Sequence, residues 1–364
     1  MSNVSILEIN EAAIKQNLSF FKSKLKKTTK ILVVVKAFSY GSDSVIISKI
    51  LQNKVDYLAV AYTNEGITLR NNGISLPILV LHPQIENLNL LVKYDLEPNI
   101  YSFNVFTEFI KVSKRANLTE YPIHLKFNTG LNRLGFHSKD VKEIVSSIKK
   151  NSQVKVASVF SHLAASEDLN EKEFTISQIN SFKKIKAKIE NSLDYNPIFH
   201  ILNTSGIINY TNYQFDMVRL GIGLYGFAND KKTTSKLENV LSLKSIISQI
   251  HIIEKGNTVG YNRAFKTTKK TKTATIPIGH ADGISRKLGN KNFYVLINNK
   301  KANIIGNVCM DMIMVDITNI NCKEGDEVII FNSQKMIEDI SNKLDTIPYE
   351  FLTMISQRVN RIKV

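Results

Sequence analysis

Basic and hydrogen-bonding side chains recur at the ends of short apolar runs of this 364-residue chain, in the loops that follow these runs, and before the glycine-rich stretch LGIGLYG. Amines and imidazoles of this kind transfer protons, and guanidinium and hydroxyl groups bind anions. A lone lysine at the end of an apolar run often only reaches toward water. As a set at comparable positions, the side chains predict an active site. They are Lys36, Lys126, Arg133, His162, Asn203, Thr204, Ser205 and Arg219.

The apolar runs themselves indicate how these side chains are positioned. They are ILVVV (31–35), YLAVA (57–61), PILVL (77–81), PIHLKF (122–127), VKVASVF (154–160) and PIFHIL (197–202). Longer stretches such as 104–116 and 171–190 lie between them and carry apolar residues at helical spacing. Strands that alternate with helices form parallel sheets. Sustained over this length, the pattern predicts a (β/α)8 barrel, whose chemistry lies at the carboxyl ends of the strands.

The pattern changes after Gly226. A polar stretch at 229–235 resembles a linker, and strand-like runs such as TATIPIG, FYVLINN and DEVIIF follow with little helical periodicity. We therefore expect an α/β barrel at residues 1–235 and a mainly β domain at 236–364. Residues 1–10 are a candidate addition to the second domain.

Composition and charge exclude several classes of protein. The net charge of +16 comes from scattered lysines rather than from a basic binding module, so we expect a solvated surface and no nucleic-acid partner. No apolar run is long enough to span a bilayer, and the sequence begins without a secretion signal, so we expect a cytoplasmic protein without membrane contact. The seven histidines show no ligand spacing, so no metal is expected.

Several motifs together carry a resemblance to one family. VVKAFSYGSDS resembles the cofactor-lysine motif of alanine racemases. Further segments resemble the family's other signatures in their order: HLKFNTGLNRLGF, VFSHLAASE, HILNTSG, MVRLGIGLYG, TVGYNRAF, IPIGHADGISR and GNVCMDMIMVDI. They extend from residue 31 to residue 316. The resemblance implies an isomerase that interconverts L- and D-alanine with pyridoxal 5'-phosphate and supplies D-alanine for peptidoglycan.

The resemblance also assigns roles to residues. It makes Lys36 the Schiff-base lysine and one catalytic base, and Tyr261 the base on the opposite face. Cofactor binding falls to Lys36, Tyr40, Arg133, His162, Asn203, Thr204, Arg219, Gly221 and Ile222, and substrate binding to Arg133, Met310 and Asp311. Arg219 would face the pyridine nitrogen, where the barrel-type decarboxylases place a carboxylate. Lys126 matches a position that carries a carbamate in many relatives, although an ordinary strand-end lysine is an alternative.

The resemblance further implies a homodimer in which Tyr261, Met310 and Asp311 complete the active site of the other subunit. The chain departs from the family pattern at Phe38, at His280, where tyrosine is common, and at Gln357, where some members place a further tyrosine. A broader-specificity or serine racemase would share every motif and remains an alternative. A decarboxylase is disfavoured by Arg219, and a non-catalytic cofactor-binding protein is disfavoured because Lys36 and Tyr261 are both present.

Overall fold

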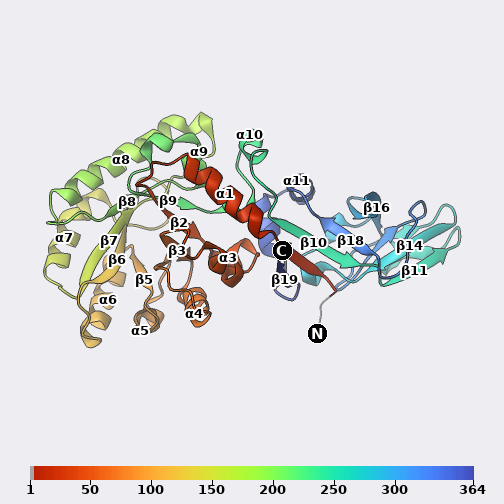
Figure 1. Ribbon diagram of the computed structural model, residues 1–364, viewed down its shortest axis with the longest axis horizontal. Coiled ribbons are helices and arrows are strands. Elements are labelled where there is room, and N and C mark those ends of the chain that lie inside the picture. The colour runs from red at the N-terminus through yellow and green to blue at the C-terminus, as the bar shows by residue number, and fades with distance from the viewer. Residues whose placement is uncertain (1–3) are drawn as a thin grey trace.

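The computed structural model describes residues 4–364, and eight parallel strands form a nearly closed barrel at one end of the molecule (Figure 1). Their order in the sheet is β8-β7-β6-β5-β4-β3-β2-β9. Backbone bonds from Asp216 N to Phe199 O (3.0 Å) and from Arg219 N to Leu202 O (2.9 Å) join the two ends of this order. The strands are β2 (Lys30–Val34), β3 (Tyr57–Val60), β4 (Ile78–Val80), β5 (Glu97–Ile100), β6 (Tyr121–Lys126), β7 (Val154–Phe160), β8 (Ile198–His200) and β9 (Met217–Leu220).

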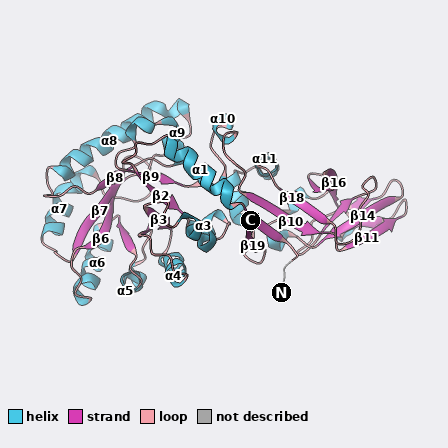
Figure 2. Cartoon of the chain, viewed as in Figure 1, coloured by secondary structure: helices cyan, strands magenta, loops and turns pink. Residues whose placement is uncertain are grey.

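Helices surround the barrel on the outside (Figure 2). Their buried faces are apolar. In α6, for example, Val105, Phe106, Phe109 and Ile110 recur at helical spacing and are all buried. The helices of this part are α1 (Glu11–Ser23), α3 (Ser44–Leu51), α4 (Thr63–Asn71), α5 (Leu88–Lys93), α6 (Phe103–Arg115), α7 (Val141–Lys149), α8 (Lys172–Glu190) and α9 (Thr204–Asn209). The short segment α2 (Lys36–Tyr40) is a left-handed turn at the end of β2 rather than a regular helix. The barrel predicted from the alternation of strands and helices is confirmed.

Two barrel strands were not among the predicted ones. β5 reads EPNI and β9 reads MVRL, so each carries polar or charged residues where a buried strand is expected to be apolar. Both strands are nevertheless fully buried. The polar side chains of Glu97 and Arg219 point to partners within the barrel, which is why apolar periodicity does not reveal these strands.

A second, mainly β part lies at the other end of the molecule (Figure 1). Its nine-stranded sheet has the order β11-β14-β17-β16-β15-β18-β10-β1-β19. β1 pairs antiparallel with β10 and parallel with β19, so the beginning of the chain belongs to this sheet. The strands are β1 (Ile6–Ile9), β10 (Leu241–Ile246), β11 (Gln249–Ile253), β14 (Thr271–Ile276), β15 (Tyr294–Ile297), β16 (Lys300–Ile305), β17 (Ile313–Asp316), β18 (Glu327–Phe331) and β19 (Asn360–Lys363), beside a separate pair β12 (Thr258–Val259) and β13 (Phe265–Lys266).

Three helices accompany this part. The short helix α10 (Lys231–Thr234) lies inside the stretch predicted to be a linker; Asp230 caps it by accepting a bond from Thr233 N. α11 (Gln334–Leu344) and α12 (Pro348–Met354) follow β18. Gln334 bonds through Nε2 to the carbonyls of Gly226 and Leu237, so α11 is tied to the chain that leaves the barrel. Within residues 4–364, no helix combines the length and the apolar character that crossing a lipid bilayer requires.

Candidate active site

One cavity of about 620 Å³ opens at the carboxyl ends of the barrel strands. Most of the predicted site residues of the barrel part meet there, although they are spread over more than 180 positions of the sequence. The predicted residues that line it are Lys36, Tyr40, Lys126, Arg133, His162, Asn203, Thr204, Ser205, Arg219, Gly221 and Ile222. The lining contains two lysines and two arginines but no aspartate or glutamate. The cavity therefore suits an anionic ligand.

A left-handed turn presents Lys36 and Tyr40 to this cavity. Ala37, Phe38, Ser39 and Tyr40 have φ values of 52°, 53°, 56° and 55°, and none of them is a glycine. Each such residue costs about 1–2 kcal/mol relative to a right-handed conformation. Surrounding contacts hold the turn in place because Ala37 N donates to Glu65 Oε1 (2.6 Å) and the hydroxyls of Ser39 and Tyr225 bond to each other.

The carboxyl-terminal end of the chain secures the same turn. The guanidinium of Arg361, the second residue of β19, donates to the carbonyl of Gly41 through Nη2 (2.9 Å) and Nε (3.2 Å). The same group lies 5.3 Å from the centre of the Phe38 ring. Gly41 has a φ of 83°, and a Cβ there would lie 2.1 Å from Leu352 O in α12. The second part of the chain thus supports the backbone that carries Lys36.

Both cavity lysines have a pKa below the ordinary value of a lysine. Burial lowers the pKa of Lys36, and the positive charge of Arg133 lowers it further, while Glu65 opposes the change. Burial lowers the pKa of Lys126 to about 8, and Arg133, Arg219 and Lys36 add repulsion. A neutral amine is a nucleophile and a base, whereas an ammonium group is neither. The lowered pKa therefore raises the fraction of each amine that is neutral and reactive.

Arg219 is the most rigidly held of these cations. It is 4% exposed, and its Nη2 donates to Ser161 O (2.7 Å), Ile201 O (3.0 Å) and His162 Nδ1 (3.1 Å). Its Nη1 donates to His200 Nδ1 (2.7 Å). Burial, followed by repulsion from Arg133, lowers its pKa to about 9. Burial and the neighbouring Arg219 also lower the pKa of His162 well below its usual range, so this imidazole is neutral.

Hydrogen-bonding groups and small residues form a further part of the cavity lining. Thr204 Oγ1 accepts bonds from Gly221 N (3.1 Å) and Gly223 N (3.4 Å). Asn203 caps α9 by accepting from Gly206 N (2.9 Å). Gly221 leaves room for the Tyr40 hydroxyl, since a Cβ at this position would lie 2.6 Å from Tyr40 Oη. Burial raises the pKa of Tyr40, so its phenol stays protonated and can donate.

Arg133 lies on a tight loop at the edge of the cavity. Phe127 and Phe136 pair across the base of this loop, and Asn128 Oδ1 accepts from Gly130 N (3.1 Å) and Asn132 N (3.0 Å) within it. The loop backbone is therefore held although Arg133 itself is exposed. An exposed guanidinium at a cavity edge can meet an incoming carboxylate.

Three predicted residues lie outside the cavity of their own chain. Tyr261 is 71% exposed and Met310 is 59% exposed, and both belong to the β part. Tyr261 opens the 3-10 helix η6 (Tyr261–Arg263), and the exposed Asp311 bonds through Oδ1 to Arg358 (2.6 Å). Within one chain, Tyr261 therefore lies outside the cavity that Lys36 lines.

Some cavity residues were missed from the sequence. Tyr349, in α12, lines the cavity, and its ring centre lies 6.1 Å from that of Tyr40. Tyr62 and His82, which follow β3 and β4, also line it. The two latter positions could have been found by the rule that placed Lys36, since each follows a predicted strand. Gln357, at whose position some family members have a further tyrosine, is exposed and does not line the cavity.

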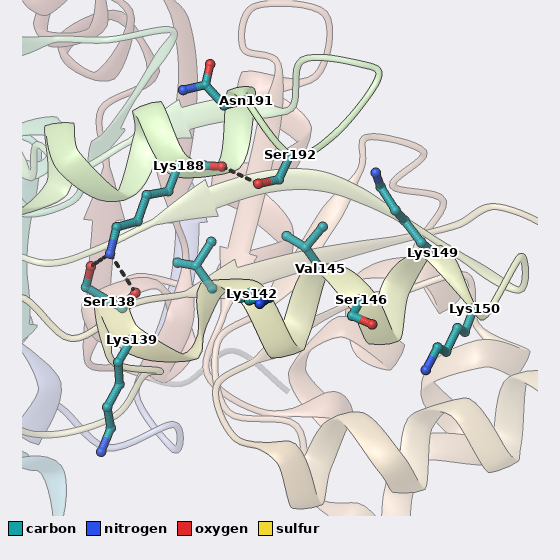
Figure 3. Close-up of a pocket in the computed structure, with 11 residues that line it drawn as sticks. Ser138, Lys139, Lys142, Val145, Ser146, Lys149, Lys150, Lys188, Asn191 and Ser192 are labelled. Carbon is teal, nitrogen blue, oxygen red and sulfur yellow. Dashed lines mark hydrogen bonds between the residues drawn. The ribbon is translucent and has the colours of Figure 1, made fainter.

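A second hollow, on the outer surface between α7 and the end of α8, has a different character (Figure 3). Five lysines line it, including the Lys149–Lys150 pair. In Figure 3 Lys139, Lys149 and Lys150 extend away from one another, and Lys188 bonds to Ser138. No buried reactive group faces this hollow. Among residues 4–364, no cluster of histidine, cysteine or acidic side chains could hold a metal ion.

Fold and cavity together define a barrel enzyme that binds an anionic ligand beside lysines of lowered pKa. Two family models cover most of the chain: the alanine racemase N-terminal domain matches residues 9–229 and the alanine racemase C-terminal domain matches residues 240–363. The chain belongs to the alanine racemase family.

Individual relatives agree over the full length. The alanine racemase of Methanococcus maripaludis is 35% identical over 98% of this chain and 97% of its own. The solved alanine racemase of Clostridium difficile superposes with a TM-score of 0.94 at 35% identity and covers 100% of this chain and 96% of its own. The solved enzyme from Bartonella henselae, which has covalently bound pyridoxal phosphate, has a TM-score of 0.86 at 27% identity over 100% of both chains.

Proposed function

We propose that the protein is an alanine racemase that interconverts L- and D-alanine with pyridoxal 5'-phosphate and thereby supplies D-alanine for peptidoglycan. The observation that carries this proposal is Lys36, a lysine of lowered pKa in a cavity without carboxylates. When bound, the cofactor draws electrons from the α-carbon of an amino acid, which makes its proton removable. The cavity fits this cofactor because it offers an amine, donors for a phosphate and a buried guanidinium.

We assign the binding roles as follows. Tyr40, Thr204, Gly221 and Ile222 hold the phosphate, with Asn203 fixing the loop that carries Thr204. The protonated phenol of Tyr40 supports this role because it can donate a hydrogen bond to an anion such as a phosphate. The amine of Lys36 would hold the cofactor covalently. Arg133 binds the carboxylate of the substrate at the edge of the cavity.

Arg219 favours racemisation over other reactions of the same cofactor. A guanidinium only donates hydrogen bonds, so it leaves the ring nitrogen of the cofactor without a proton. Beside such a donor the bound cofactor would supply only weak electron withdrawal, which would favour return of the proton over loss of the carboxylate. Its bonds to two backbone carbonyls and two imidazoles keep the guanidinium from turning away.

Lys126 is proposed to carry a carbamate. Its pKa of about 8 leaves roughly a tenth of the amine neutral at pH 7, and carbon dioxide reacts only with neutral amines. The resulting anion would offset the repulsion among Lys36, Arg133 and Arg219 and would orient Arg133. An added mass of one carboxylate on the peptide that contains Lys126 is the expected finding, measured on protein kept in bicarbonate.

Tyr261 is proposed to act from a second subunit. Lys36 takes or returns the proton on one face of the α-carbon, and a phenol is needed on the other. Because Tyr261 lies outside the cavity of its own chain, we propose a head-to-tail homodimer in which Tyr261, Met310 and Asp311 of the second subunit complete the site. In this arrangement residues 1–235 form the cofactor-binding domain, apart from β1, which pairs with β10 and β19 of the completing domain at residues 236–364. His162, held by Arg219, would bond toward the phenol.

A cytoplasmic location stays a prediction from the sequence.

Chiral analysis of purified protein incubated with L-alanine, and separately with L-serine, tests the activity. We expect D-alanine to accumulate to equality with L-alanine in the presence of the cofactor. Faster conversion of L-serine would favour the broader-specificity alternative. Carbon dioxide release without a D-isomer would point to a decarboxylase and contradict the proposal.

Mixing two inactive variants tests the composite site separately. Lys36→Ala and Tyr261→Phe are each expected to lose racemisation. Refolded together at equal amounts, about half of the dimers are hybrids, and each hybrid has one site with both native residues. About a quarter of the native activity should therefore return. If Lys36 and Tyr261 acted within one chain, no activity would return on mixing.

A further inference from the structure

A buried chain of polar side chains crosses the interior of the barrel below the cavity. It starts at Arg219 on β9 and runs through His200 on β8, Ser158 on β7 and His124 on β6 to Glu97 on β5. The successive distances are 2.7 Å, 3.0 Å, 2.6 Å and 2.6 Å. All of its members are buried. Each of the five strands from β5 to β9 thus contributes one residue to this chain of hydrogen bonds.

The two ends of the chain determine the direction of every hydrogen bond in it. The guanidinium of Arg219 can only donate, so His200 accepts at Nδ1 and carries its proton at Nε2. That proton points to Ser158, whose own hydroxyl proton then points to His124 Nδ1. His124 consequently carries its proton at Nε2, which donates to the Glu97 carboxylate, an acceptor only. With an ionised Glu97 and two neutral imidazoles, a single arrangement of protons satisfies all four bonds.

Such a chain compensates a buried charge that has no carboxylate beside it. The acceptors of Arg219 are backbone carbonyls and the imidazoles of His162 and His200. An unpaired buried cation is costly, and the cavity itself adds only further cations. Hydrogen bonds aligned in one direction polarise one another, so the negative charge of Glu97 strengthens the bond that His200 offers to Arg219. The Tyr57 hydroxyl also bonds to Glu97, and its ring packs edge-on against His124.

We propose that Glu97 is a positioning residue for catalysis, acting through His124, Ser158 and His200 to hold the guanidinium of Arg219 charged and in one orientation. This inference rests on the proposed function, because it concerns the group that we assign to the cofactor ring nitrogen. Glu97 itself does not line the cavity. Its effect is therefore on the rate of proton return at the α-carbon and not on the binding of substrate.

Substitutions at two points of the chain test the proposal in the holoenzyme. Glu97→Gln keeps the shape and removes the charge, whereas Ser158→Ala breaks the chain in its middle. We expect each to lower kcat about tenfold, equivalent to about 1.4 kcal/mol, with KM for alanine changed less than twofold. The double variant should resemble Ser158→Ala to within about threefold, because a broken chain no longer transmits the charge. Ser158→Thr, which retains a hydroxyl, should recover most of kcat.

Ser113→Ala is the matched control. Ser113 is also fully buried and bonds to Phe109 O within α6, away from the chain. Loss of the Ser113 hydroxyl should lower the melting temperature about as much as Ser158→Ala does, without lowering kcat. Equal kcat values for Glu97→Gln, Ser158→Ala and Ser113→Ala would overturn the proposal, as would fully additive losses in the double variant.

Nitrogen NMR of the histidine rings provides a readout independent of turnover. In the native holoenzyme we expect His124 and His200 to be neutral Nε2–H tautomers whose ring protons exchange slowly with solvent. A proton at Nδ1 of either ring would overturn the proposed chain even if a variant failed to fold. A protein without racemase activity but with these tautomers would instead refute the proposed function and leave the chain of bonds intact.

Discussion

Gly221→Ala is a sharp test of the proposed phosphate site. A Cβ at Gly221 would lie 2.6 Å from Tyr40 Oη, and an ordinary contact begins at 3.4 Å, so the hydroxyl must move by about 0.8 Å. The Tyr40 ring cannot follow freely, since it packs 5.0 Å from the Tyr225 ring and 6.1 Å from the Tyr349 ring. The substitution is therefore expected to remove the bond from Tyr40 to the phosphate while leaving the barrel folded.

The size of the effect follows from the kind of bond that is lost. A hydrogen bond to a charged group contributes about 1.5–3 kcal/mol. The dissociation constant of pyridoxal phosphate should therefore rise roughly 10- to 150-fold. The free energy of unfolding of the cofactor-free protein should change by less than about 1 kcal/mol, because the displaced group is the end of one side chain.

Titration of the cofactor into stripped protein, followed by visible absorbance, measures this constant. Tyr40→Phe removes the hydroxyl that causes the clash, and the same Cβ would lie 3.5 Å from Tyr40 Cζ, an ordinary contact. In the Tyr40→Phe background, Gly221→Ala should therefore weaken binding less than twofold further. A full 10-fold loss in that background would refute the reasoning and place the cause in the backbone of Gly221.

Three further predictions concern other groups of the site. Lys36→Ala should abolish both racemisation and the cofactor mass that borohydride reduction otherwise fixes on the peptide containing residue 36; a retained mass would exclude Lys36 as the anchor. Lys126 has a pKa of about 8 in the folded protein against 10.5 in the unfolded chain, so the unfolded state binds more protons between these two pH values. The free energy of unfolding should therefore rise with pH across this window, by about 3 kcal/mol at most. Lys126→Met should flatten that rise in denaturant titrations of cofactor-free protein in buffer free of carbon dioxide. Glu65→Gln should lower the free energy of unfolding by about 1–3 kcal/mol in the same assay, since Glu65 accepts from three backbone N–H groups. Glu108→Gln on α6, where the half-buried carboxylate pairs only with Lys111, should change it by less than about 0.5 kcal/mol.

The sequence alone predicted the barrel, because its apolar runs and helical stretches alternate with a regular period. The predicted run at 154–160 coincides with β7, and the predicted helical stretch at 171–190 begins one residue before α8. It also predicted which barrel residues gather, because the carboxyl ends of parallel strands meet at one face whatever the details of packing. Lys36, Lys126 and His162 could be placed in one cavity for that reason, because each lies at the end of a predicted strand or directly beyond it.

Only the tertiary structure revealed the left-handed turn at Ala37–Tyr40. Nothing in the letters AFSY favours positive φ, since that conformation is usual for glycine and asparagine. The turn exists because Glu65, Tyr225 and Arg361 bind it from three distant parts of the chain. Such cooperation between remote groups has no local signal.

The polar interior of the barrel was likewise decided by packing. Glu97, His124 and His200 lie on buried strands, where a sequence argument expects apolar side chains, and each is tolerated only because a neighbouring strand supplies its partner. Tyr349 likewise lines the cavity only because folding brings α12, which is distant in the sequence, to the barrel. Periodicity reports how one element meets the core, whereas these contacts depend on which elements become neighbours, and that is settled only when the chain has folded.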